Sequence, residues 1–251
     1  MKYFKQFLSS FLLLLSFLLI WEGYTSLGFF PANILPSPTA IFQAMVNFSD
    51  VLFVHTMQTV LEAIIGLVAA IALGLFVAII IFLFPLIRQA IYPFLVLSQS
   101  VPIIALAPLL LLWFGFGLLP KVIIVTLYCF FPVAIAVSDA LLQTDQALVD
   151  LLKGMKATPW QILIFVRLPG SLPAFFSGLK IAVTYAIAGA IVGEYVGAYQ
   201  GLGIFMQRSA NGHAIALVFA SVIIATLTSI IFFIIVSLAE KLFIPWRVKN
   251  G

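Results

Sequence analysis

Very few side chains in this sequence could take part in chemistry, and the most conspicuous is Glu194, in the stretch GAIVGEYVGAY. A carboxylate inside an apolar run is costly to hold away from water, so by default it indicates a lined cavity, a translocation pathway or the outer gate of one. The alternatives are that Glu194 reaches the outer headgroup region or pairs with Arg208. Its neighbours Gly189, Gly193 and Gly197 recur every four residues, which favours close helix packing.

Other polar residues within apolar runs include Glu22 and a group around Glu62. Glu62 shares a helix face with His55 and Gln58, which predicts a polar contact between helices rather than a binding site. Cys129 is the one cysteine, and the two histidines lie far apart, so we predict neither a disulfide nor a metal site. The sequence contains no G-x-x-x-x-G-K-[ST] phosphate loop, so the chain cannot bind ATP in that way, and no nucleophile–base pair indicates an enzyme.

These residues belong to a chain whose solvent must largely be lipid. Of its 251 residues, 64% are hydrophobic and 8% are charged, whereas soluble domains are about 25% charged. The mean hydropathy is +1.26. The net charge of +4 does not indicate nucleic acid, because the bases are scattered in ones and twos at the ends of apolar runs. Continuous apolar runs predict spanning helices rather than a β-barrel, in one transmembrane domain over residues 1–251.

Six runs are long enough to span a bilayer core, which takes roughly 20 residues in a helix. We predict spans at about 7–27, 56–84, 91–113, 118–138, 174–196 and 216–238. Pro93, Pro102 and Pro108 predict kinks or a break in the third span. The first run could instead be a cleavable signal peptide, although it is long and lacks an A-x-A-like site.

The basic residues predict the orientation of the spans. With the N-terminus inside, Lys121 and Arg208 fall on the outer face and the other bases on the inner face, which favours both termini in the cytoplasm of a multi-pass cell-membrane protein. The inner bases are Lys2, Lys5, Arg88, Lys153, Lys156, Arg167, Lys180, Lys241, Arg247 and Lys249. The longest inner loop is then 139–173, between the fourth and fifth spans.

This inner loop has the pattern of two short helices. Apolar residues recur at three- and four-residue spacing, as on one face of an amphipathic helix: Leu148, Leu151, Leu152 and Met155. Thr158 can cap a second helix with Pro159 at its first position. Leu168-Pro169 and Leu172-Pro173 should stop that helix before the fifth span. The pattern leaves two interpretations open, an interfacial helix resting on lipid headgroups or a docking knob for a cytoplasmic partner.

The loop resembles the EAA loop of ATP-binding-cassette (ABC) importer permeases, whose pattern is E-A-A-x3-G-x9-I-x-L-P. Asp150 takes the Glu position, Leu151-Leu152 take the paired Ala positions, and Leu168-Pro169 match. Lys156 stands where the Gly belongs, and Val166 replaces Ile. Other segments resemble the branch that handles sulfonates, taurine, nitrate and thiamine-related pyrimidines: LPSPTAIF, APLLLLWFGFG, FFPVAI, LPGSLPAFFSGLKIA and GEYVGAYQGLG. VRLPGSLPAFFSGLKIA followed by GEYVGA looks most like permeases for thiamine-precursor pyrimidines.

The resemblance implies an all-α membrane protein with the type I ABC importer permease fold and a cytoplasmic coupling helix. It implies as partners a second permease subunit, in a homodimer, two cytoplasmic ATPase subunits that bind ATP and Mg, and an external substrate-binding protein. The chain itself would bind no cofactor. The ATPase-coupling loop would act through these residues: Asp150, Leu151, Leu152, Lys153, Met155, Lys156, Ala157, Trp160, Leu168 and Pro169.

The cargo implied by the resemblance is a small solute. A thiamine-precursor pyrimidine is favoured, with aliphatic sulfonate, taurine or nitrate as the alternative. An ion-coupled secondary transporter is a distant alternative, because we find no convincing internal repeat and few acids. If the substrate is a flat pyrimidine, Tyr128 or Tyr185 could stack on it in transit, although aromatic residues here mostly indicate an interface belt and core.

Overall fold

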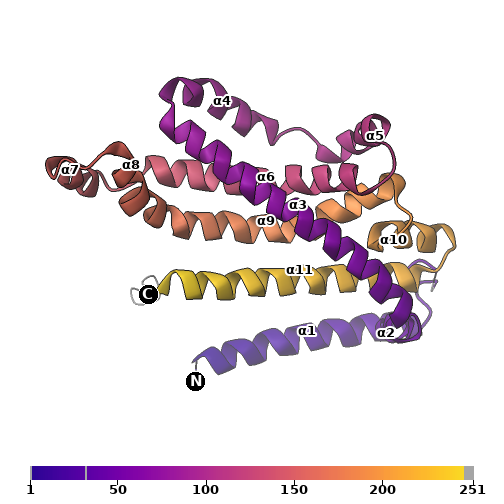
Figure 1. The fold of residues 1–251 in the computed structure, drawn as a ribbon. Helices are drawn as coiled ribbons and strands as arrows, with labels where there is room; N and C mark the ends of the chain where they lie inside the picture. Colours follow the sequence, from indigo (N-terminus) through magenta and orange to yellow (C-terminus); the bar gives the residue numbers. More distant parts are fainter. Residues whose placement is uncertain (1, 32, 246–251) are drawn as a thin grey trace.

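The computed structural model describes the backbone of residues 2–31 and 33–245, and the side chains of this part from Leu8 onward (Figure 1). The described part is helical throughout. Its elements are α1 (Lys2–Ser26), α2 (Pro38–Asn47), α3 (Ser49–Leu83), α4 (Pro85–Ser98), α5 (Ile103–Phe114), α6 (Leu118–Leu142), α7 (Gln146–Gly154), α8 (Pro159–Ile162), the π-helical turn η1 (Leu163–Arg167), α9 (Leu168–Gly197), α10 (Leu202–Asn211) and α11 (Ile215–Phe243). Of the bases that predict orientation, Arg247 and Lys249 and the side chains of Lys2 and Lys5 lie outside the described residues.

The core lies where α3, α6 and α9 pack against one another. Glycines let their backbones approach closely: a Cβ added at Gly66 of α3 would lie 2.4 Å from the Cβ of Val125, and one at Gly178 of α9 would lie 2.5 Å from the carbonyl oxygen of Pro132. Such contacts matter in lipid, where apolar side chains gain little by leaving one apolar environment for another and packing holds helices together. The predicted all-α membrane fold is confirmed.

The membrane-spanning helices follow the hydropathy pattern. Within the described residues, five helices are long and apolar enough to cross a membrane, and α4 with α5 makes a sixth if this bent pair is one span. The pair bends by 101°. The break predicted for the third span therefore lies at Pro102, just before α5, where the missing N–H of proline costs nothing. Pro93 and Pro108 lie inside α4 and α5.

The helix before the fifth span is not stopped by its prolines, so this prediction was wrong. α8 continues through η1 into α9, and Pro173 lies inside α9. At the end of the π turn the Leu168 N–H donates to the carbonyl of Leu163, five residues back. Pro169 then falls in the first turn of α9, where the widened π turn accommodates a residue without a donor. One continuous helix runs over residues 159–197.

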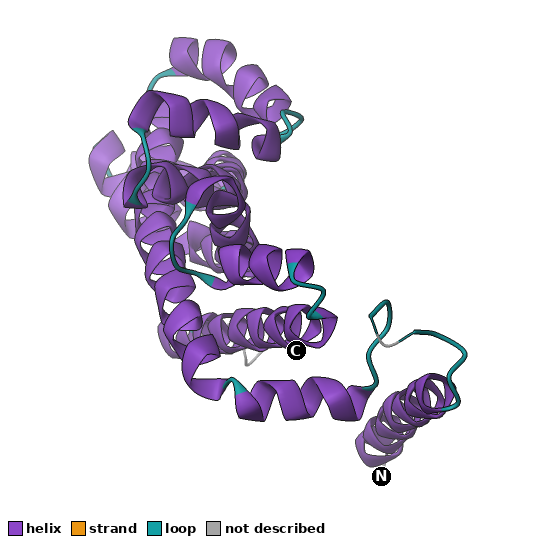
Figure 2. Ribbon diagram, turned by 90° about the vertical axis from the view of Figure 1, so that its right-hand side faces the viewer, coloured by secondary structure: helices purple, strands orange, loops and turns teal. Residues whose placement is uncertain are grey.

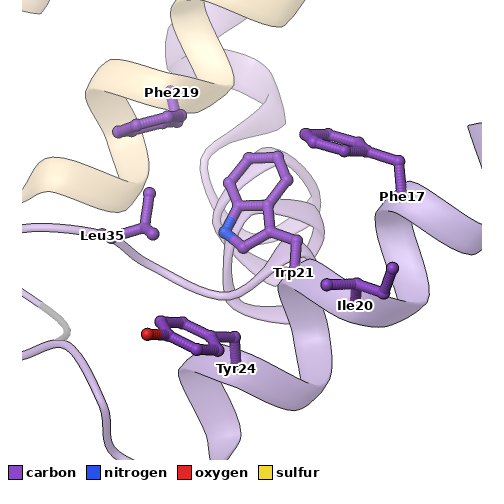
Figure 3. Close-up of a pocket in the computed structure, with 6 residues that line it drawn as sticks. All are labelled: Phe17, Ile20, Trp21, Tyr24, Leu35 and Phe219. Carbon is purple, nitrogen blue, oxygen red and sulfur yellow. The ribbon is translucent and has the colours of Figure 1, made fainter.

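α1 lies at the edge of the bundle (Figure 2) and contacts it through its last turns. Trp21 packs against Phe219 of α11, with ring centroids 6.0 Å apart. Figure 3 shows the apolar pocket around this pair, lined also by Phe17, Ile20, Tyr24 and Leu35. Glu22 accepts hydrogen bonds from the backbone N–H of Thr39, at 3.0 Å, and from its hydroxyl, at 2.7 Å. This glutamate of α1 therefore holds the first turn of α2.

The short helices lie at opposite ends of the bundle. α7 and α8 lie at the same end as the start of α1 and the end of α11 (Figure 1). α2 and α10 lie at the other end. We call these the α7 end and the α10 end.

Candidate functional site

At the α7 end, a group of apolar side chains is left uncovered by the rest of the described chain. α7 is capped by the side chain of Asp145 and buries Val149. By contrast, Leu151 is 62% exposed, Met155 is 70% exposed and Trp160 of α8 is 60% exposed. Exposed apolar clusters of this kind mark interaction surfaces. We call Leu151, Met155 and Trp160 the coupling knob, after the role that the resemblance to the EAA loop implies; that role stays a prediction.

The backbone of the turn between α7 and α8 explains why the EAA pattern has glycine at the position of Lys156. Lys156 adopts φ 61°, in the left-handed region. Its N–H donates to the carbonyl of Lys153, at 2.9 Å, and the N–H of Ala157 donates to the carbonyl of Leu152, at 3.0 Å. These two bonds form a Schellman motif, whose left-handed position is usually glycine. A residue with a Cβ adopts this conformation at a cost of about 1–2 kcal/mol, so Lys156 keeps the turn but under strain.

The start of α8 confirms the predicted cap. The N–H of Gln161 donates to the hydroxyl oxygen of Thr158, at 3.3 Å, and the N–H of Thr158 donates to the side-chain oxygen of Gln161, at 2.7 Å. This is a capping box, with Pro159 in the first turn. Together with the Schellman motif it holds α7 and α8 in a defined relation, so that both contribute to the coupling knob.

The charged residues of the loop take two different positions. Asp150 and Lys153 pair with each other at 3.3 Å on the surface of α7, with both side chains more than half exposed. Arg167, to which the sequence assigned only a role in orientation, ties η1 to two other helices. Its Nη1 donates to the carbonyl of Leu141 at the end of α6, at 2.6 Å, and its guanidinium lies 4.6 Å from the ring centre of Phe82 in α3.

The other predicted loop residues lie beside the coupling knob or away from it. Leu152 and Ala157 are half-buried at the base of the turn. Leu168 is half-buried and Pro169 is exposed, in the first turn of α9. The structure thus leaves Leu151 and Met155 of α7 and Trp160 of α8 exposed at the α7 end, and places Leu168-Pro169 in the first turn of α9.

The two tyrosines predicted to meet a flat substrate lie together between α6 and α9. The rings of Tyr128 and Tyr185 are 6.4 Å apart between centroids and inclined by 26°. Gly189 leaves room for the first ring, because a Cβ there would lie 3.0 Å from Cδ2 of Tyr128. Tyr185 is 48% exposed on the surface of α9. A role in substrate transit stays a prediction.

At the α10 end, Glu194 is fully buried and bonds to two other elements. One carboxylate oxygen accepts from the hydroxyl of Thr59 in α3, at 2.7 Å, and the other accepts from the N–H of Gly203 in α10, at 2.5 Å. The nearby Gly193 and Gly197 serve close packing, as predicted: a Cβ at Gly193 would lie 3.1 Å from Cα of Lys121. A role for Glu194 in the pathway or its outer gate stays a prediction.

Glu62 makes the polar contact between helices that its surroundings predict. Its Oε1 accepts from Lys121 of α6, at 2.6 Å, and from Gln58, at 2.7 Å. His55, from the same face of α3, instead accepts from the N–H of Gly201, at 3.0 Å. Sequence reasoning missed the parts played by Lys121 and Thr59. The one available signal for Lys121 was a lysine in the first turn of an apolar run.

Comparisons with known proteins agree with this arrangement. The family model described as the binding-protein-dependent transport system inner membrane component matches residues 70–249. The chain is 37% identical over 251 residues to the formylaminopyrimidine transport permease protein ThiX of Halalkalibacterium halodurans, covering 100% of both chains. It is 39% identical over 207 residues to a probable ABC transporter permease protein of Haemophilus influenzae, covering 82% of this chain and 84% of that one.

A solved structure shows the same fold. The permease chain in an inward-facing conformation of the MetNI methionine ABC transporter matches with a TM-score of 0.69 at 19% identity, over 78% of this chain and 98% of that one. The family model covers both the coupling knob and the tyrosine pair. The chain therefore belongs to the family of binding-protein-dependent transport system inner membrane components, and is a membrane-spanning permease subunit of an ABC importer.

Proposed function

We propose that this permease carries a thiamine-precursor pyrimidine of the formylaminopyrimidine class into the cell. The main support for this substrate is the 37% identity, over the full length of both chains, to a permease named for formylaminopyrimidine. The segments around Leu168–Ala182 and Gly193–Ala198 favour the same class. The stacked pair Tyr128 and Tyr185 adds a physical reason, since aromatic faces suit a flat heterocycle.

The exposed face of α9 supports a pathway beside these tyrosines. Next to Tyr185 this face carries the small or hydroxyl residues Ser177, Thr184 and Ala188, together with Ile181. The exposed residues of α11 include Thr226 but are mostly large and apolar, among them Leu227, Ile231, Ile234 and Ile235. In lipid, polar groups usually face a protein interior or a water-filled cavity. The face of α9 around Tyr185 is thus the side that suits a solute, and the face of α11 the side that suits acyl chains.

The rest of the transporter follows from the same proposal. A second copy of this chain completes the pathway, an external binding protein delivers the pyrimidine, and two separate ATPase subunits bind ATP and Mg and hydrolyse ATP. The coupling knob docks on one ATPase subunit, where its exposed apolar side chains become buried. The α7 end and both termini lie in the cytoplasm, which the distribution of bases supports.

Competition for uptake tests the substrate. Membrane vesicles holding the permease, its ATPase and its binding protein take up labelled formylaminopyrimidine, and unlabelled pyrimidine should suppress this uptake while excess taurine, alkanesulfonate or nitrate should not. No uptake of labelled formylaminopyrimidine, together with ATP-dependent uptake of labelled taurine, alkanesulfonate or nitrate in the same vesicles, would favour the alternative cargo. Uptake that persists without ATP but collapses with the ion gradient would contradict the importer mechanism itself.

A further inference from the structure

Three consecutive backbone N–H groups at the start of α10 donate to side chains of two spanning helices. Gly201 donates to Nδ1 of His55, at 3.0 Å, and Leu202 donates to the hydroxyl of Thr59, at 2.8 Å. Gly203 donates to Glu194, at 2.5 Å. The first turn of a helix normally leaves its N–H groups without partners inside the helix. Here α3 and α9 supply those partners, and we call this set of bonds the α10 latch.

The α10 latch is shaped for the backbone of this segment. Gly201 has φ 127°, and a Cβ added there would lie 2.2 Å from the carboxyl carbon of Glu194. A Cβ at Gly203 would lie 2.5 Å from the carbonyl oxygen of Ile191. Thr59 and Glu194 are both 0% exposed. The buried carboxyl group of Glu194 meets the start of α10, where the helix dipole places partial positive charge.

Thr59 takes part in two hydrogen bonds, one to Glu194 and one from Leu202. Its hydroxyl donates to Glu194 of α9 and accepts from Leu202 of α10, so one oxygen links three helices. A valine at this position has the same shape but can make neither bond. The side of α10 away from the latch is exposed and polar, with Gln207, Arg208 and Asn211.

The α10 latch and the coupling knob are attached to the same helix. The helix over residues 159–197 is unbroken, with Trp160 near its start and Glu194 near its end. Figure 1 shows α7 and α8 at one end of the bundle and α10 at the other, joined by α9. Beyond the π turn and Pro173, α9 continues without a break to Glu194, so a displacement passed from Trp160 into α9 reaches the α10 latch along one helix.

We propose that the α10 latch carries the movement of the coupling knob to α10, so that α10 moves on the far side of the membrane in step with the ATPase. Glu194 and Thr59 are positioning residues in this device, since they act through α10 and not on the solute. The inference rests on the coupling role proposed above for the knob. It assigns to Glu194 a mechanical task at the α10 end, in place of contact with the solute.

Amide hydrogen exchange of the permease–ATPase complex in lipid nanodiscs tests the latch directly. Exchange is compared without nucleotide and after trapping with ATP and vanadate. In the wild type, peptides covering α7 and α10 should both change exchange between the two states. In Thr59→Val, the α7 peptide should keep its change, and the α10 peptide should lose it while residues 201–203 exchange faster. Thr59→Ser, which restores the hydroxyl, should restore the response.

Two further variants keep the result interpretable. Thr228→Val removes a hydroxyl in α11 that bonds only to the carbonyl of Ile224, and should leave both responses intact. Glu194→Gln leaves one oxygen acceptor where the carboxyl group offers two, to Thr59 and Gly203, and should weaken the α10 response if Thr59→Val does not fold. An α10 response that survives in both latch variants would overturn the proposal. A wild type in which α7 shows no protection by the ATPase would overturn the coupling role itself, and the latch with it.

Discussion

Lys121 Nζ lies 2.6 Å from Glu62 Oε1, and both side chains are buried where α3 and α6 pack. Two charges held away from water need each other, because removing one leaves the other uncompensated. A single substitution in this pair should therefore destabilise the packing of α3 against α6 near the α10 end.

Breaking this pair should destabilise the permease strongly. Glu62→Gln or Lys121→Met alone leaves a buried charge, at a cost of about 3–5 kcal/mol. The double variant removes both charges and should recover most of that loss. Thermal unfolding in detergent measures the effect. Two single variants as stable as the wild type would show that the pair is not held as the structure places it.

Because the turn at Lys156 is strained, replacing this lysine by glycine should not destabilise the loop. Lys156→Gly relieves about 1–2 kcal/mol of left-handed strain, offset in part by about 0.4–1 kcal/mol of added chain entropy in the unfolded state. The stability of the α7–α8 loop should stay the same or rise. Lys153→Gly, inside α7, is the matched control and should cost about 1 kcal/mol. Limited proteolysis of the loop compares the two, and faster cleavage of Lys156→Gly than of Lys153→Gly would contradict the turn assignment.

The coupling knob should tolerate no charge at its centre. Leu151→Asp places a carboxylate in the apolar surface that meets the ATPase, so the ATPase should no longer co-purify with the permease. Leu242→Asp is the control, because Leu242 is 79% exposed near the end of α11 and outside the knob. Equal recovery of the ATPase with both variants would remove Leu151 from the docking surface.

Tyr128 and Tyr185 should affect uptake through their aromatic rings rather than through their hydroxyl groups. Loss of one aromatic contact is worth about 0.5–1.5 kcal/mol, or about two- to tenfold in uptake of the pyrimidine. Tyr185→Ala should show this loss and Tyr185→Phe should not. Tyr24→Ala, in α1, serves as the control. Full uptake by a variant with alanine at both Tyr128 and Tyr185 would remove them from the pathway.

Structural features that depend on residues close together in the chain could be predicted from the sequence. The cap at Thr158, the position of Pro159 and the break at Pro102 each depend on residues within one turn of the chain, whose preferences act directly. Long apolar runs likewise identify spans, although α3 begins at Ser49, well before the predicted 56, because the apolar residues 51–54 extend the helix before the polar His55.

Features that depend on which helices pack together could not be read in the same way. The partner of Glu62 lies 59 residues away on α6, and the partners of Glu194 lie on α3 and α10. Pro169 and Pro173 led to a wrong prediction because a π turn lets the helix continue past them. The local sequence gives no recognisable signal for this π turn. The spacing of the sequence located the loop to which we assign coupling, and the structure shows which of its residues are exposed.

ATP-driven uptake with and without an intact coupling knob tests the account most directly. Proteoliposomes are loaded with ATP on the side of the ATPase and given the binding protein and labelled formylaminopyrimidine on the other side. The account predicts uptake by the wild type that depends on ATP, and its loss in Trp160→Asp, where the permease still folds but the ATPase is no longer engaged. Undiminished ATP-driven uptake by Trp160→Asp would contradict the role of the knob, and wild-type uptake that needs no ATP would contradict the account as a whole.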